Sequence, residues 1–220
     1  MLSVAGRSFA VEVVRRRGAR RYVVRVTPEA TLRLTVPHGA PIAAGLSFAA
    51  AQSSWIEREW LRLSKQLAPW TVGTICWYRG ERLAIRLTDG RVCLGQDDAG
   101  PWSPSADIRA AVTARMRAVA AAELPARCRE LAESAGIRIG RVSVRDQRSR
   151  WGACSSRGTI TLNWRLAQVP PGVRDYIIWH ELAHITVPNH SRRFWRLVET
   201  LCPAWREHEH WLKAHEREFF

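Results

Sequence analysis

The sequence lacks several patterns that mark common classes of protein. Its 220 residues contain no run of eighteen apolar residues, no C-x-x-C pair and no internal repeat. A transmembrane helix needs about 20 consecutive apolar residues, so we expect no membrane partner. The first residues also lack the charged segment and following apolar stretch of a signal peptide. These absences favour a soluble globular protein.

Cysteine and lysine are scarce as well. The five cysteines are odd in number and widely scattered, which favours reduced thiols and a cytoplasmic location over a disulfide framework. Only Lys65 and Lys213 are lysines, whereas 32 residues are arginine. A GC-rich genome also produces such a bias, so the arginine content alone does not indicate a binding function.

Basic residues nevertheless outnumber acidic ones by 34 to 20, which gives a net charge of +14. Residues 1–100 carry 15 basic and 8 acidic side chains and residues 101–220 carry 19 and 12, so each part has a charge of +7. The densest run, residues 15–21, resembles the tip of a hairpin, for which a solvated loop is the simpler interpretation. A positive field of this size attracts polyanions, and non-specific nucleic-acid binding is the alternative.

The first 100 residues are predicted to form a basic, β-rich N-terminal module. Residues 9–36 alternate like paired strands, and Pro41 opens a helical stretch. A second β-rich segment follows at residues 74–95, with Asp89-Gly90 as a tight hairpin turn. The segment 96–104 is rich in Asp, Gly, Pro and Ser and is the best linker candidate.

Residues 101–220 are predicted to form a second, α+β domain. A helix covers residues 105–135, with a break expected at Pro125, and short strands lie at 142–144 and 159–162. Ser191 is expected to cap a later helix, and Pro203 to begin the last one.

The segment 180–190 reads HELAHITVPNH and carries the clearest chemical signal. Residues 173–185 have the apolar spacing of a buried helix, on which His180 and His184 are offset by about 40°. Both imidazoles therefore reach one metal ion, and Glu181 points about 100° away, where it can hold a water molecule. Two imidazoles, one general base and an open coordination position are the zinc-peptidase arrangement.

A third ligand is needed to complete such a site. Pro188 ends the helix and turns the chain, so that His190 can fold back toward the ion. Glu199 and Glu207 are the alternatives and would give a site with two histidines and one glutamate. A purely structural zinc site remains a further alternative, although such sites favour several cysteines and none lies between residues 155 and 201.

Several separate segments together resemble one family. RWGACSS at residues 150–156 and ITLNWRL at 160–166 precede the histidine segment, and SRRFW follows it at 191–195. Over residues 140–215 the chain closely resembles the YgjP-like metallopeptidases, and it is remotely similar to the SprT/Spartan-type proteases that cut DNA–protein crosslinks. Ala153 stands where the family often has serine. No methionine follows residue 190, so the metzincin label does not apply.

The resemblance implies an α+β, zincin-like domain in the cytosol that acts on a protein or peptide substrate. It assigns zinc to His180, His184 and His190 and the role of general base to Glu181. The competing hypotheses are a protease that depends on DNA and a non-catalytic, zinc-stabilised interaction module.

The segment around Trp151 and Gly152 is a candidate rim of the substrate cleft. An edge strand at 159–163 would then bind an extended peptide by adding it to the sheet. Core packing for Trp151 and a simple turn at Gly152 explain the same residues equally well.

Three further groups of residues are weaker candidates for the site. Cys154 is either a small buried thiol or a redox or inhibitory zinc ligand, and His208 either supports the site or is an ordinary histidine on the surface. The oxyanion partner that a peptidase requires is open among Arg148, Arg150 and Asn163.

Overall fold

The computed structural model describes residues 1–4, 6–27 and 29–219, with only the backbone described for residues 65–67. It divides into two compact units, unit 1 (Met1–Pro69) and unit 2 (Trp70–Phe220). The predicted boundary after residue 100 therefore differs from the observed one, because the second β-rich segment packs within unit 2. The two units are described separately below.

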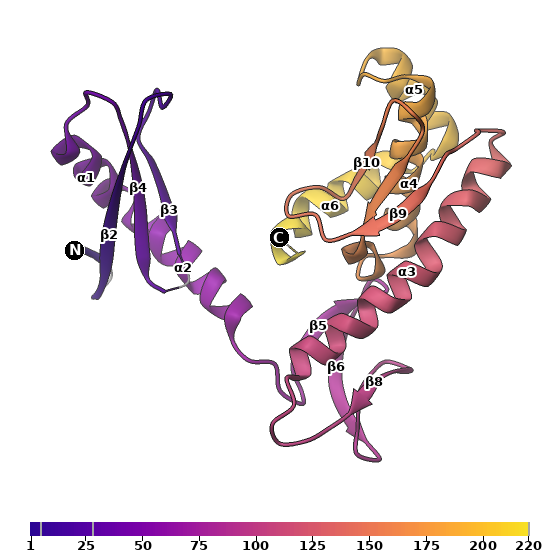
Figure 1. Cartoon of the computed structure of the whole chain (residues 1–220), viewed down its shortest axis with the longest axis horizontal. Helices are drawn as coiled ribbons and strands as arrows, with labels where there is room; N and C mark the ends of the chain where they lie inside the picture. Colours follow the sequence, from indigo (N-terminus) through magenta and orange to yellow (C-terminus); the bar gives the residue numbers. More distant parts are fainter. Residues whose placement is uncertain (5, 28, 220) are drawn as a thin grey trace. The chain divides into compact units, whose positions relative to one another are not determined.

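Unit 1 is a four-stranded sheet with two helices packed against it (Figure 1). The strand order is β1-β2-β4-β3, in which β2 and β4 are parallel and the outer pairs are antiparallel. The alternating pattern predicted for residues 9–36 buries Phe9, Leu32, Leu34 and Val36 beneath the helices. The elements are β1 (Leu2–Val4), β2 (Arg7–Arg16), β3 (Val23–Val26), β4 (Thr31–Pro37), α1 (Ile42–Ala51) and α2 (Ser53–Leu67).

Unit 2 begins with an antiparallel sheet of four consecutive strands, β5 to β8. The Asp89-Gly90 turn is confirmed, because Thr88 pairs with Arg91 and both turn residues have positive φ. The linker prediction for residues 96–104 is wrong, since this segment contains β8, which pairs with β7. The strands are β5 (Ile75–Tyr78), β6 (Glu81–Thr88), β7 (Arg91–Leu94) and β8 (Asp97–Pro101).

The turn between β5 and β6 ties this sheet to the rest of unit 2. The amide of Arg79 donates to the carbonyl of Ala167 at 3.0 Å, and that of Gly80 donates to Gln168 at 2.9 Å. A Cβ atom at Gly80 would lie 2.6 Å from Pro170 Cα, so only glycine permits this approach. These contacts explain why residues 74–101 belong with the C-terminal part of the chain.

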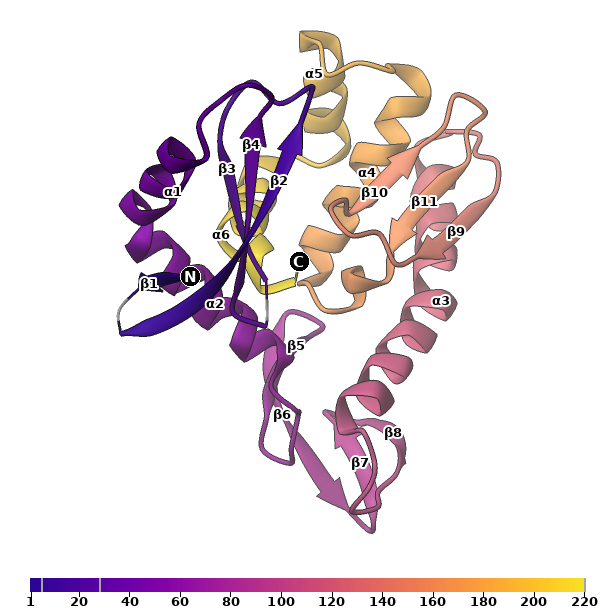
Figure 2. The ribbon, with the colours of Figure 1, turned by 60° about the vertical axis from the view of Figure 1, so that its left-hand side comes forward.

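A second sheet and the remaining helices complete unit 2 (Figure 2). The sheet order is β10-β11-β9, with β10 antiparallel and β9 parallel to the central strand. Helix α3 is continuous through Pro125, so the predicted break is absent, and it packs against both sheets. The elements are α3 (Ile108–Ser134), β9 (Val142–Arg145), β10 (Gly152–Cys154), β11 (Ile160–Asn163), the 3-10 helix η1 (Trp164–Ala167), α4 (Pro171–Thr186), α5 (Arg192–Leu201) and α6 (Trp205–Phe219).

The architecture confirms the predicted α+β class with a β-rich N-terminal part. One apolar core joins both sheets and the helices of unit 2, and a separate core fills unit 1. Among the described residues, no helix has the length and apolar content needed to cross a membrane.

Candidate active site

The candidate site is built on helix α4. Pro171 occupies the first turn, where its missing amide hydrogen costs no helical hydrogen bond, and the helix runs to Thr186. Ile178 and Leu182 are completely buried, which fixes the rotation of the helix against the core. That rotation carries the predicted histidines and Glu181 to the wall of a cavity.

Three imidazoles converge at this wall. Ligand atoms of His180, His184 and His190 all lie within 4.8 Å of one another, and among the described residues they form a group that could hold a metal ion. The Nε2 atoms of His180 and His190 face each other at 3.1 Å. Glu199 instead pairs with Arg206 at 2.6 Å on an exposed surface, so it is not placed as the third ligand.

The segment after α4 brings His190 back to the helix. Helix α4 ends at Thr186, and the carbonyl of the next residue, Val187, lies 3.3 Å from Nδ1 of His184. When this Nδ1 carries the hydrogen, Nε2 of His184 is left free to bind a metal. The Asn189 side chain accepts a hydrogen bond from the amide of Ser191, which tightens the turn before α5. Ser191 holds the predicted N-cap position, although its side chain makes no capping hydrogen bond.

Phe194 of helix α5 supports all three imidazoles. It is completely buried, and its ring centroid lies 4.9 Å from His180, 4.5 Å from His184 and 4.8 Å from His190. Trp195 contacts the rings of His180 and His190 from the same helix, at 5.9 and 5.8 Å. The sequence pattern predicted Phe194 only as part of a buried stripe, because its contact with the histidines depends on how α5 packs.

The electrostatics of the cluster suit a cation. Burial, reinforced by the neighbouring imidazoles of His184 and His190, lowers the pKa of His180 to about 4. Burial and His190 also lower the pKa of His184. Neutral imidazoles are the form that binds metal ions. Three converging imidazoles fit zinc and leave room for a fourth, non-protein ligand.

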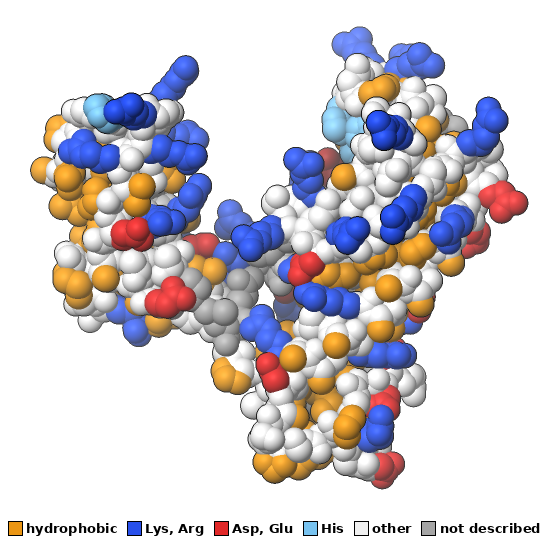
Figure 3. Space-filling view, in the orientation of Figure 1, with side chains coloured by type: hydrophobic (Ala, Val, Ile, Leu, Met, Phe, Trp, Pro, Cys, Tyr) orange, Lys and Arg blue, Asp and Glu red, His pale blue; other side chains and the backbone are white. Residues whose placement is uncertain are grey.

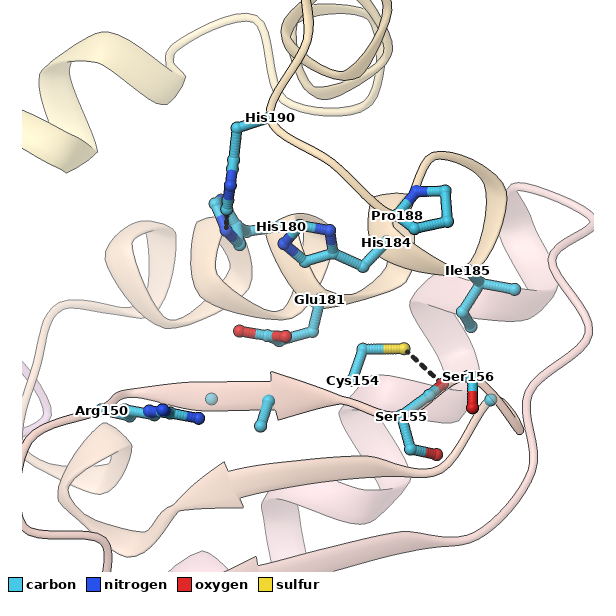
Figure 4. Close-up of a pocket in the computed structure, with 13 residues that line it drawn as sticks. Arg150, Cys154, Ser155, Ser156, His180, Glu181, His184, Ile185, Pro188 and His190 are labelled. Carbon is cyan, nitrogen blue, oxygen red and sulfur yellow. Dashed lines mark hydrogen bonds between the residues drawn. The ribbon is translucent and has the colours of Figure 1, made fainter.

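Glu181 lies between α4 and strand β10, and its carboxylate lines the same cavity as the three imidazoles (Figure 4). Only 7% of the residue is exposed. Burial raises the pKa of its carboxyl group to about 7, and the charge of Arg150 opposes that shift. A carboxylate with such a pKa is a stronger base than an ordinary glutamate and accepts a proton near neutral pH.

Gly152 makes the position of Glu181 possible. A Cβ atom at residue 152 would lie 2.7 Å from both Cγ and Oε1 of Glu181. No side chain fits there unless the carboxylate moves. The sequence marked Gly152 as a turn or cleft residue, and the structure shows that its role is to leave space beside the candidate base.

The cavity has a volume of about 560 Å3 and is walled by β10, the segment after it and α4. Strand β10 lies at the edge of this sheet that borders the cavity, whereas β11 is paired on both sides. The prediction that residues 159–163 form an edge is therefore wrong, and the free edge next to the cavity belongs to Gly152–Cys154.

The three candidates for the oxyanion partner differ in their positions relative to the cavity. Asn163 is fully buried, and its side-chain nitrogen donates to the carbonyls of Gln147 and Arg150 at 2.8 Å each. Asn163 therefore anchors the segment before β10 and is not free to bind an oxyanion. Arg150 lines the cavity, whereas Arg148 is exposed and is not among the lining residues.

Cys154 and His208 also receive structural explanations. Cys154 lines the cavity, and burial together with the nearby Glu181 raises the pKa of its thiol, which disfavours the thiolate that binds metals. His208 packs against Gly172, at whose position a Cβ atom would lie 2.7 Å from the imidazole. Its contacts with α4 are part of the packing between α4 and α6.

Comparison with known proteins identifies one family. The model of the YgjP-like metallopeptidase domain matches residues 20–215. Among curated proteins, none matches the chain. Among solved structures, the chain is similar to the metallopeptidase zymogen of Pyrococcus abyssi abylysin, with 26% identity and a TM-score of 0.38. That similarity covers 41% of this chain and 93% of the other.

Proposed function

The chain belongs to the YgjP-like metallopeptidase family, and we propose that it is a zinc-dependent peptidase in which Glu181 is the general base. Membership of the family supports a peptidase with a metal cofactor. The observation that carries the finer proposal is the convergence of three imidazoles within 4.8 Å, two of them on the helix that also carries a buried glutamate.

His180, His184 and His190 would hold the ion at the wall of the cavity that they line. A zinc ion bound there would supply Lewis acidity to a water molecule and to the scissile carbonyl. Glu181 accepts the proton of the attacking water and passes it to the nitrogen of the leaving amine. Its raised pKa suits both steps, because the group must first take up and then release a proton near neutral pH.

The substrate would lie along the free edge of β10. An extended peptide can add to this edge through main-chain hydrogen bonds, which positions its backbone without selecting its side chains. Arg150 lines the same cavity and is the candidate for stabilising negative charge on the carbonyl oxygen.

Elemental analysis beside a peptidase assay tests the proposal. We expect about one zinc ion per wild-type chain and none in His184→Ala, whereas exposed His210→Ala, on the surface of α6, should keep the metal. Glu181→Gln should keep the zinc and lose activity by a factor of about 10² or more.

Two outcomes contradict the proposal in different ways. A folded, zinc-supplemented wild type without metal excludes the zinc site. Full peptidase activity in zinc-loaded Glu181→Gln excludes Glu181 as the base. Unfolding on removal of the metal, with no activity in any form, favours the non-catalytic module.

A further inference from the structure

Unit 1 contains a groove that the proposed peptidase site does not use. The groove has a volume of about 790 Å3 and lies between strand β3 and the helices, where α1 ends and α2 begins. We call it the β3 groove. The lining side chains that the argument below uses are Arg20, Arg21, Tyr22, Phe48, Gln52 and Trp55.

Aromatic rings form the apolar part of the β3 groove. Phe48 and Trp55 are each 37% exposed, although both are large side chains that gain free energy from burial. Tyr22 stacks on Phe48 with ring centroids 6.2 Å apart, and its hydroxyl donates to the carbonyl of Pro41 at 3.0 Å. Tyr22 and Phe48 therefore support each other, and both line the groove together with Trp55.

Arginine forms the polar part of the same groove. Arg20 and Arg21 line it, and the guanidinium of Arg15 reaches the rim by donating to the carbonyl of Ala40 at 3.2 Å. No carboxylate occurs among the residues described as lining the groove. Figure 3 shows Lys and Arg side chains gathered toward the top of unit 1 in that view.

The charge of unit 1 is concentrated as well. Residues 1–69 carry eleven basic and four acidic side chains, and thus half of the net charge of the chain in less than a third of its length. Two of the four carboxylates, Glu12 and Glu59, are already paired with Arg33 and Arg62. The uncompensated charge therefore lies on exposed arginines such as Arg20 and Arg21.

We propose that the β3 groove binds single-stranded nucleic acid, with bases stacked on Trp55 and Phe48 and phosphates held by Arg15, Arg20 and Arg21. Aromatic faces within a positively charged groove are what sequence-tolerant binding of single strands requires. A neutral peptide added to the free edge of β3 would use the apolar faces but would leave the arginines without a partner. The proposal concerns unit 1 and is independent of the zinc site.

Fluorescence anisotropy of a labelled oligothymidylate tests the proposal on the full-length protein. Trp55→Ala should weaken binding about tenfold, and Trp55→Phe should restore most of the loss. The matched control is Trp102→Ala in unit 2, which removes a tryptophan that is 40% exposed and should leave binding unchanged.

A charge reversal supplies an independent variant on the exposed rim. Arg20→Glu should weaken binding and lower the slope of log affinity against log salt by about one unit. Arg138→Glu in unit 2 is also exposed, changes the net charge by the same amount, and should have a smaller effect.

Three results would overturn the proposal. The first is the absence of any anisotropy change at low salt. The second is an equal effect of Arg20→Glu and Arg138→Glu with none from Trp55→Ala, which would mean that only the overall field attracts the strand. The third is a polyglutamate peptide that binds as tightly as the oligonucleotide and is equally weakened by Trp55→Ala, which would make the groove a peptide site.

Discussion

The two units carry the same net charge but arrange it differently. Unit 1 has +7 on 69 residues, and the 151 residues of unit 2 also have +7. In unit 2 many arginines pair with carboxylates, as Arg127 does with Asp175 between α3 and α4. In unit 1, Arg16, Arg17, Arg20 and Arg21 are exposed and form no ion pair with the described residues.

Charged groups therefore act in two different ways in this chain, as buried groups in unit 2 and as exposed arginines in unit 1. Unit 2 places Glu181 and His180 where burial changes their pKa values, an effect that is local and depends on packing. Unit 1 keeps its arginines in water, where their field acts over about 10 Å and is screened by salt. The activity of unit 2 should therefore respond to small steric changes, whereas the binding by unit 1 should respond to ionic strength.

The largest expected effect comes from one methyl group beside the candidate base. Gly152→Ala places Cβ within 2.7 Å of the Glu181 carboxylate and forces it to move. A displacement of about 1 Å in an active site costs about a hundredfold in rate, so we expect such a fall in kcat with zinc content unchanged. A steady-state assay of zinc-loaded protein measures it.

Ala153→Ser is the matched control for this prediction. It adds one atom to the neighbouring residue of the same strand, which also lines the cavity. Activity within about twofold of wild type is expected there. Equal losses in both variants would show that β10 tolerates no change at all and would remove the specific role given to Gly152.

The local part of the site could be predicted from the sequence. The apolar spacing of residues 173–185 predicted α4, which runs from Pro171 to Thr186, and positions four apart on a helix necessarily share a face. Pro188 and the turn that follows it were enough to place His190 beside that face. The role of these histidines as zinc ligands stays a prediction.

The non-local part could not be predicted. Residues 96–104 have the composition of a linker, yet β8 is stabilised by pairing with β7, which the composition does not encode. The boundary after Pro69 depends on hydrogen bonds from Arg79 and Gly80 to the chain before α4. Likewise, only packing reveals that Phe194 lies under the imidazoles.

Lowering the pH should weaken zinc binding by unit 2 but not oligonucleotide binding by unit 1. Neutral imidazoles bind the metal, so lowering the pH makes protons compete with zinc and weakens its binding. Because the pKa of His180 is about 4 and that of His184 is also lowered, both stay neutral below the usual histidine range. We therefore expect the zinc affinity to fall by only about tenfold between pH 7.5 and 5.5.

Oligonucleotide binding by unit 1 should stay constant across that same range. Its arginines remain charged at every pH used. Competition with a metal chelator measures the zinc affinity, and fluorescence anisotropy on the same samples measures the oligonucleotide affinity. Zinc affinity that rises in acid would contradict the assignment of histidine ligands.

A smaller effect is expected from the aromatic support of the imidazoles. Phe194→Leu removes a ring that contacts all three histidines, and the loss of such outer contacts should weaken zinc binding by about tenfold or less. Val198→Ala, also fully buried on α5, should lower the stability without a change in zinc affinity. Equal zinc affinities in both variants would mean that Phe194 contributes only to the apolar core and does not support zinc binding.

The smallest effect compares ion pairs of the two units. In unit 2, Arg127 and Asp175 are 31% and 18% exposed, whereas Arg33 and Glu12 in unit 1 are 52% and 51% exposed. Asp175→Asn should lower the free energy of unfolding by about 1–2 kcal/mol, because the partly buried carboxylate of Asp175 is paired with both Arg127 and Arg174. Glu12→Gln should cost less than about 0.5 kcal/mol, since exposed pairs are screened by water and salt. Urea titration of each variant measures the difference, and equal costs would mean that the contrast in pairing between the units has no consequence for stability.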